Sequence, residues 1–129
     1  MKKYLIIVVM FFMFIVSGCS DNGKEEVTDT KTNSTIITGV EAKEKITNGA
    51  ILLDVRTKEE FDDTHIEGAI LLPLSEINSS SVAKIIPDNT VEIIVYCRSG
   101  NRSSQAVDEL RYLGYENVYD LGSINNWEE

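Results

Sequence analysis

The sequence predicts an α/β domain whose mostly parallel central sheet has about five strands and is flanked by helices. Short apolar runs recur along the chain, and helical stretches separate them. Two of these runs, Ala50 to Val55 and Val91 to Tyr96, are apolar at nearly every position, as expected of strands buried on both faces of a parallel sheet. Strands that alternate with helices in this way form a parallel α/β sheet.

The first part of the chain is expected to supply three strands and two short helices. Thr38 is the N-cap expected for the first helix, and Thr57 with Glu60 forms a capping-box pair that opens the second. Pro73 stops the third strand because it cannot donate a backbone hydrogen bond. The expected elements are a short strand at Ile36-Ile37, a helix from Val40 to Ile46, the strand from Ala50 to Val55, a helix through Asp63 and a strand from Ala69 to Leu72.

The second part is expected to supply two strands and the longest helix. Between Ser75 and Ile86 the sequence allows either a helix or two irregular turns. After the strand ending at Tyr96, apolar residues at helical spacing predict a helix from Ser103 to Leu113, which Gly114 ends. Val118 to Leu121 is the last expected strand. Functional groups are expected at the carboxyl ends of these strands.

The first eighteen residues have the architecture of a secretory signal peptide. Lys2 and Lys3 precede an apolar run from Leu5 to Val16. A helix of this length covers roughly 18 Å, against about 30 Å of hydrocarbon core, so cleavage is favoured over a membrane span. The tetrad of residues 16–19 resembles the lipobox of bacterial lipoproteins, which implies that Cys19 becomes the acylated first residue. An ordinary signal peptide that happens to end beside a cysteine is the alternative.

Residues 19–35 are expected to form the lipidated cysteine and a flexible tether, and residues 36–129 the folded domain. The tether is polar and cannot bury a core. Without Lys2 and Lys3 the chain has 10 basic and 21 acidic residues, a formal charge of −11. That balance argues against nucleic-acid binding and against electrostatic docking on anionic lipid. We therefore expect an extracytoplasmic protein held on the bacterial cell membrane by the lipid on Cys19.

Cys97 is the thiol that remains after lipidation, because Cys19 is the only other cysteine. It opens the loop Cys97-Arg98-Ser99-Gly100-Asn101-Arg102-Ser103, which joins a buried strand to an amphipathic helix. Gly100 can turn backbone N–H groups inward, and the helix start adds free amides, so the loop should form an anion site. With Arg98 and Arg102 adding charge, Cys97 should be a thiolate. Its sulfur should lie at the floor of the loop, facing these amides, rather than sealed in the interior.

Three sets of residues resemble the signatures of rhodanese-like domains over roughly residues 36 to 127. The first set is Leu52-Leu53-Asp54-Val55-Arg56 with Glu60-Phe61, His65-Ile66-Glu67-Gly68-Ala69 and Pro73; the second is the loop 97–103; the third is Gly122 with Trp127. Thr64 and Ser123 depart from the family pattern, which usually has glycine at both positions. These departures affect local turn geometry and the rim of the site, and leave the nucleophile in place.

The resemblance implies a single-domain thiosulfate sulfurtransferase that works by ping-pong catalysis. Cys97 would take the outer sulfur of a donor such as thiosulfate as a persulfide and pass it to a thiol, cyanide or protein acceptor. The loop residues Arg98, Ser99, Gly100, Asn101, Arg102 and Ser103 would bind the anionic donor. The loop would be supported by hydrogen bonds and ion pairs from Asp54 and Arg56, with Glu60 as a further partner. A monomer is expected.

No cofactor or metal is expected, because His65 and one free cysteine offer too few ligands. His65 is interpreted as structural, since a thiolate activated by charge and dipole needs no base. Two other functions stay open. One is a noncatalytic persulfide carrier or sensing module; the other is a small cysteine-based phosphatase or arsenate reductase. The spacing between Cys97 and Arg102 gives Cys-x4-Arg, where such phosphatases use Cys-x5-Arg, so sulfur transfer is favoured.

Overall fold

The computed structural model describes residues 36–128, in which four parallel strands form one sheet. The strands are β1 (Ile51–Asp54), β2 (Ile70–Leu71), β3 (Ile93–Cys97) and β4 (Val118–Ser123), and their order is β2-β1-β3-β4. The predicted strand at Ile36-Ile37 is reduced to an isolated parallel bridge between Ile36 and Asp120. The predicted α/β class and parallel sheet are confirmed, with four strands and one bridge in place of about five strands.

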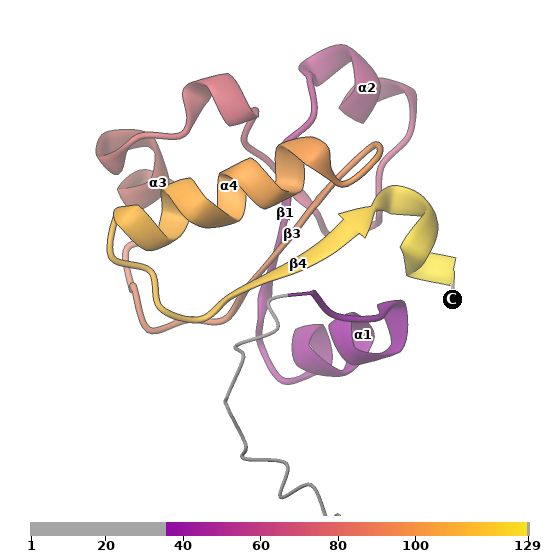
Figure 1. The fold of residues 1–129 in the computed structure, drawn as a ribbon, viewed down its shortest axis with the longest axis horizontal. Helices are drawn as coiled ribbons and strands as arrows, with labels where there is room; N and C mark the ends of the chain where they lie inside the picture. Colours follow the sequence, from indigo (N-terminus) through magenta and orange to yellow (C-terminus); the bar gives the residue numbers. More distant parts are fainter. Residues whose placement is uncertain (1–35, 129) are drawn as a thin grey trace, which may run out of the picture. The chain divides into compact units, whose positions relative to one another are not determined.

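Helices cover both faces of this sheet, as Figure 1 shows. Helices α3 and α4 lie on one face, and α1 with the 3₁₀-helix η2 lies on the other. Local capping explains where the short helices begin, because Thr38, Thr57 and Asn78 each form a capping box with the residue three positions later. The helices are α1 (Gly39–Thr47), α2 (Lys58–Asp63), α3 (Ser79–Ile85), α4 (Asn101–Tyr112), η1 (Leu74–Glu76) and η2 (Ile124–Glu128).

Several element boundaries differ from those predicted. The segment from Ser75 to Ile86 is the 3₁₀-helix η1 followed by α3, because the Asn78 side chain caps a new helix instead of continuing the old one. Strand β2 has only two residues. Helix α4 begins at Asn101, two residues earlier than expected, because Gly100 adopts φ +96° and turns the chain directly into the helix.

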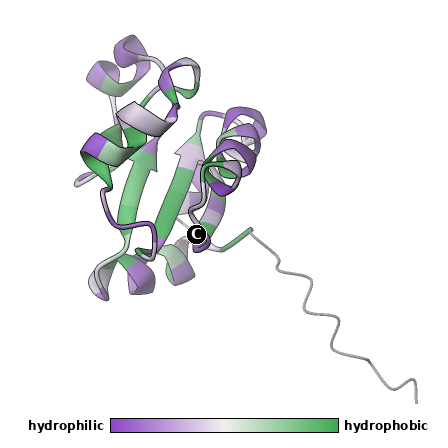
Figure 2. Cartoon of the chain, turned by 90° about the vertical axis from the view of Figure 1, so that its left-hand side faces the viewer, coloured by the Kyte–Doolittle hydropathy of each residue, from purple (hydrophilic) through white to green (hydrophobic). Residues whose placement is uncertain are grey.

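The core has one apolar cluster on each face of the sheet. Strand β3 is buried along its whole length, and Figure 2 shows the apolar strands between helices with polar outer surfaces. Alternate β3 residues point to opposite faces. Val95 and Cys97 therefore join the cluster under α3 and α4, while Ile94 and Tyr96 join the cluster under α1 and η2. Cys97 is thus fixed at the end of a strand that is packed from both sides.

The carboxyl ends of β1 and β3 place Asp54 beside Tyr96, one residue before Cys97. Strand β4 bulges between its pairings with Val95 and Tyr96, so that its last residue, Ser123, lies opposite Cys97. Helix α2 follows β1 directly and lies at this end of the sheet (Figure 1). Within residues 36–128, the helices are all too short or too polar to cross a membrane.

Candidate active site around Cys97

The sulfur of Cys97 faces the backbone amides of the loop that follows β3. The Gly100 N–H donates a hydrogen bond to Sγ over 3.0 Å. Burial raises the pKa of Cys97, but hydrogen bonds from the hydroxyl and amide of Ser103 and from the amides of Gly100 and Ser99 outweigh it and lower the pKa below its ordinary value. The predicted orientation of the sulfur is confirmed. This loop stabilises a thiolate through aimed donors.

The Ser103 hydroxyl has two acceptors within reach and one hydrogen to give. In the structure it donates to the Gly100 carbonyl over 3.0 Å, and it also lies where it can donate to the Cys97 sulfur. A thiolate is a stronger acceptor than a neutral carbonyl. We therefore expect the hydroxyl to turn to the sulfur when Cys97 ionises, and Ser103, which is fully buried, has no competing water.

The prediction that the sulfur is not sealed in the interior is wrong for this conformation. Cys97 is 0% exposed and belongs to the apolar cluster under α3 and α4. Apolar packing beneath the strand and the loop above it together cover the sulfur. A donor molecule can therefore reach Cys97 only when part of the loop opens.

Arg102 is paired with Glu60 instead of pointing at the sulfur. Its two terminal nitrogens donate to the two Glu60 oxygens over 2.6 and 2.9 Å. This hydrogen bonding is the largest contribution that holds the pKa of Glu60 at about 2, and the Thr57 amide adds to it. The pair joins the first turn of α4 to α2. Glu60 thus supports the loop as predicted, but through Arg102 and not through Arg56.

Arg56 and Asp54 form a buried network with Tyr96 at the ends of β1 and β3. Arg56 donates to both Asp54 oxygens, with distances of 2.7 to 3.1 Å, and to the Thr64 carbonyl over 2.6 Å. The Tyr96 hydroxyl donates to Asp54 over 2.7 Å and accepts from the Ile66 amide. Asp54 is 0% exposed and Arg56 4% exposed. This network fixes the segment 64–66 to the sheet.

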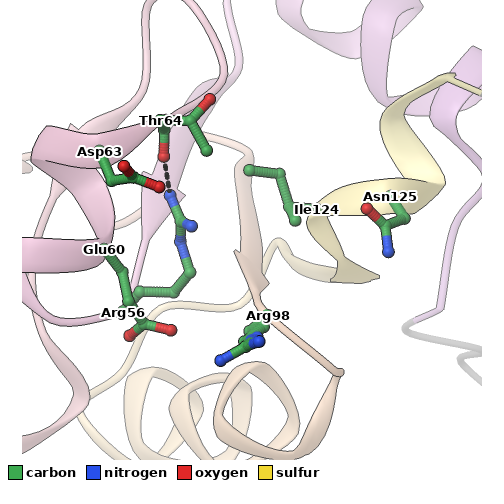
Figure 3. Close-up of a pocket in the computed structure, with 7 residues that line it drawn as sticks. All are labelled: Arg56, Glu60, Asp63, Thr64, Arg98, Ile124 and Asn125. Atoms are coloured by element: carbon green, nitrogen blue, oxygen red, sulfur yellow. Dashed lines mark hydrogen bonds between the residues drawn. The ribbon is translucent and has the colours of Figure 1, made fainter.

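A cavity of about 430 Å³ lies beside this network, at the carboxyl ends of β1 and β3. Figure 3 shows Arg56 with Glu60, Asp63 and Thr64 on one side of it, Arg98 below them, and Ile124 and Asn125 of η2 on the other side. The Arg98 guanidinium makes no hydrogen bond or ion pair within the described residues, whereas the Arg56 charge is balanced by Asp54. Arg98 is therefore the uncompensated cation at this cavity. The lining residues are Arg56, Glu60, Asp63, Thr64, Arg98, Ile124 and Asn125.

The remaining predicted residues lie away from the sulfur or contribute backbone only. The Asn101 side chain accepts from Gln105 along α4, and Ser99 is exposed. His65 stacks on Phe61 with ring centroids 3.8 Å apart, and its Nδ1 lies 2.8 Å from the Phe61 carbonyl oxygen. This arrangement fits the structural role assigned to His65. No three potential metal ligands lie together in the part of the chain that the structure describes.

Three residues of the site are not identified from the sequence. Tyr96 was interpreted only as the end of a buried strand, although a tyrosine at the carboxyl end of a parallel strand carries a hydroxyl to the functional edge of the sheet. The η2 residues Ile124 and Asn125 form a wall of the cavity. Their signal was weak, because nothing in the sequence after Ser123 predicts a 3₁₀-helix that turns back toward the site.

Comparison with known proteins places this geometry among sulfur-handling domains. The family model described as a rhodanese-like domain matches residues 38–129. The thiosulfate sulfurtransferase PspE of Escherichia coli is 35% identical over 74 residues, covering 57% of this chain and 70% of that protein. The probable adenylyltransferase/sulfurtransferase MoeZ of Mycobacterium tuberculosis is 40% identical over 78 residues, and the match covers 59% of this chain but only 19% of that protein.

Two solved structures are similar over most of their own length. A rhodanese with anions from Escherichia coli has a TM-score of 0.57 at 33% identity, covering 60% of this chain and 91% of that one. The human single-domain sulfurtransferase TSTD1 has a TM-score of 0.63 at 26% identity, covering 73% of this chain and 95% of that one.

Proposed function

The chain belongs to the rhodanese-like family, and from this premise we propose that it is a thiosulfate sulfurtransferase that carries sulfane sulfur as a persulfide on Cys97. One observation supports this most directly: the Cys97 sulfur, at the carboxyl end of β3, accepts a backbone N–H from the loop that opens α4. Aimed amides stabilise negative charge on sulfur without any reorganisation of solvent. The same donors can serve the thiolate and the persulfide anion that replaces it.

The proposed reaction has two displacement steps. The Cys97 thiolate attacks the outer sulfur of thiosulfate, an S–S bond forms, and the bond between the two thiosulfate sulfurs breaks to release sulfite with its electron pair. A thiolate or cyanide then attacks the outer sulfur of the persulfide, and Cys97 leaves as a thiolate. Charge is conserved in both steps. The first step forms the Cys97 persulfide and the second consumes it, as ping-pong catalysis requires.

Arg98 is proposed to attract the anionic donor to the cavity. The chain has a formal charge of −9, so a dianion approaching the protein is repelled overall. Arg98 is exposed and has no counter-ion within the described residues, and a cation in a concave site raises the local concentration of anions. Approach through the cavity beside Arg56 would bring the donor to the loop that covers Cys97.

The phosphatase or arsenate reductase alternative is disfavoured by the position of Arg102. An arginine in an oxyanion-binding loop must aim its guanidinium at the bound anion. Here both terminal nitrogens of Arg102 are committed to Glu60. The carrier alternative uses the same persulfide and differs only in turnover, which kinetics decides.

Intact mass after thiosulfate treatment tests the proposed function. The protein is expected to gain the mass of one sulfur atom and to lose it on reduction, because a persulfide is reversed by thiol exchange. A Cys19→Ser variant is the matched control, since it removes the other cysteine and should gain the same mass. Absence of the gain in this variant, or a gain that reductant does not reverse, would contradict a persulfide on Cys97.

We further propose that residues 1–18 are a lipoprotein signal peptide and that Cys19 carries the lipid that holds the protein on the outer side of the cell membrane. These residues, and the tether up to residue 35, lie outside the described residues, so the support comes from the sequence pattern alone. Labelled palmitate fed to expressing bacteria is expected to enter the wild-type protein and to be absent from Cys19→Ser. Equal labelling of the two proteins would contradict the proposal.

A further inference from the structure

Ser123, the last residue of β4, makes hydrogen bonds to two segments of the site. Its hydroxyl donates to the Arg98 carbonyl over 2.8 Å and accepts from the Asn125 amide over 3.2 Å. The first bond reaches the loop that covers Cys97, and the second reaches the start of η2, which forms one wall of the cavity. Ser123 is the register partner of Cys97 in the sheet, so these contacts are made one strand away from the residue that carries the sulfur.

The bond to the Arg98 carbonyl fixes the direction of a neighbouring N–H group. Arg98 C=O and Ser99 N–H belong to one peptide unit, and all described peptide bonds are trans. In a planar trans peptide the C=O and the N–H point in opposite directions. When the carbonyl is held toward Ser123, the Ser99 N–H must point away from β4. The next amide along the loop, that of Gly100, donates to the Cys97 sulfur over 3.0 Å, so the orientation of the Arg98–Ser99 peptide sets the path of the chain into that donor.

The loop and the end of β4 are packed closely enough for this bond to define the loop's position. A Cβ added to Gly100 would make an ordinary van der Waals contact with the Gly122 Cα at 3.7 Å, so the two backbones are close neighbours. The Arg98 peptide lies at the rim of this contact, where Arg98 and Ser99 are exposed. Without the fixed hydroxyl donor for its carbonyl, that peptide is free to rotate and to displace the Gly100 amide that donates to the sulfur. Glycine at position 123 would leave the carbonyl to water.

We propose that Ser123 is a positioning residue for the sulfur-transfer reaction: its hydroxyl holds the Arg98–Ser99 peptide and thereby positions the Gly100 N–H, the next donor along the loop, against the Cys97 sulfur. The inference rests on the proposed function in that the sulfur so held is the reacting atom. It goes further by assigning a role to a residue at which this chain departs from the family pattern. Ser123 touches neither donor nor acceptor in this role.

The test uses the full chain in a Cys19→Ser background, so that Cys97 is the one thiol. The rate of reaction with iodoacetamide is measured against pH for the parent, Ser123→Ala and Ser123→Thr. For each protein, the alkylation rate at low pH is divided by the maximal rate reached at high pH. A change in loop opening multiplies both rates by the same factor, so it does not alter this ratio. Arg98 on the loop and Arg102 on α4 are the cations near the sulfur, and both are unchanged in every variant.

Ser123→Ala is expected to lower this ratio about three- to tenfold, because one of the thiolate's donors is no longer aimed. Ser123→Thr keeps the hydroxyl and should stay within about twofold of the parent. Ser79→Ala is the matched control, since the Ser79 hydroxyl makes no hydrogen bond within the described residues. Its curve should superimpose on that of the parent. Ser123→Gly, which also removes the hydroxyl, serves as a second deletion if Ser123→Ala does not fold.

Two results would overturn the role of Ser123. One is a curve for folded Ser123→Ala that superimposes on the parent curve; the other is a change in Ser123→Thr as large as that in Ser123→Ala, because the hydroxyl would then be irrelevant. The thiosulfate assay on the same proteins separates this inference from the proposed function. A shifted alkylation curve with no sulfur transfer by the parent would keep the positioning role and reject the sulfurtransferase.

Discussion

Cys97→Ser is expected to lose at least about a thousandfold in the rate of thiocyanate formation from thiosulfate and cyanide. A serine hydroxyl is not ionised near neutral pH and cannot form the S–S bond that stores the transferred sulfur. The loop amides and Arg98 remain, but they can only bind the donor. The measurement is steady-state formation of thiocyanate at saturating thiosulfate, with the persulfide followed by intact mass in parallel.

Cys19→Ser is the control for this experiment and should retain the full rate, because Cys97 is the proposed nucleophile. Activity in Cys97→Ser within tenfold of the wild type would reject the mechanism. The wild-type rate also separates the enzyme from the carrier. Parallel double-reciprocal plots against thiosulfate, with an apparent kcat that rises with the cyanide concentration, indicate ping-pong turnover. A gain of one sulfur per chain without further thiocyanate formation indicates a carrier.

Arg56→Ala is expected to destabilise the folded domain by about 3–5 kcal/mol. Asp54 has no exposed surface, and Arg56 supplies three of its hydrogen bonds. Removing the guanidinium leaves a buried carboxylate with only the Tyr96 hydroxyl and one backbone amide as donors. It also frees the Thr64 carbonyl. The free energy of unfolding is measured by urea titration, with the slope compared to check that the unfolding remains two-state.

Lys58→Ala is the matched control, because it breaks an ion pair of the same kind at the surface. The Lys58 and Asp62 side chains are 71% and 57% exposed, and such pairs contribute about 0–1 kcal/mol. If Arg56→Ala lowers the free energy of unfolding by less than about 1 kcal/mol, water or a rearranged side chain compensates the Asp54 carboxylate. The network would then be dispensable for folding, and its role as a buttress would be wrong.

The fold was predictable because its signals are local. These signals are the capping boxes at Thr38 and Thr57 and the apolar run of β3. Each involves only a few neighbouring residues, so it can be recognised without knowledge of the tertiary structure. Cys97 was identified for the same reason, since strand, loop and helix follow one another in the chain. The boundaries that differed, such as the two-residue β2, depend on how neighbouring strands pair.

The pairing of side chains across the site was not predictable in the same way. Glu60 and Arg102 are 42 positions apart, as are Asp54 and Tyr96. Their contacts follow from how α2 and the strand ends are placed in space. The sequence alone suggests Glu60 as an ion-pair partner of the group formed by Asp54 and Arg56. In the folded domain Arg56 instead pairs with Asp54, and Glu60 pairs with Arg102.

The complete burial of Cys97 sets a kinetic condition on its chemistry. A sulfur atom without solvent-accessible surface reacts only during excursions of the loop, so the opening frequency is an upper limit on every reaction it undergoes. Peroxide, alkylating agents and thiosulfate are all subject to this limit. The closed loop therefore sets one ceiling on rate for the sulfur donor and for the oxidants that would destroy the thiol.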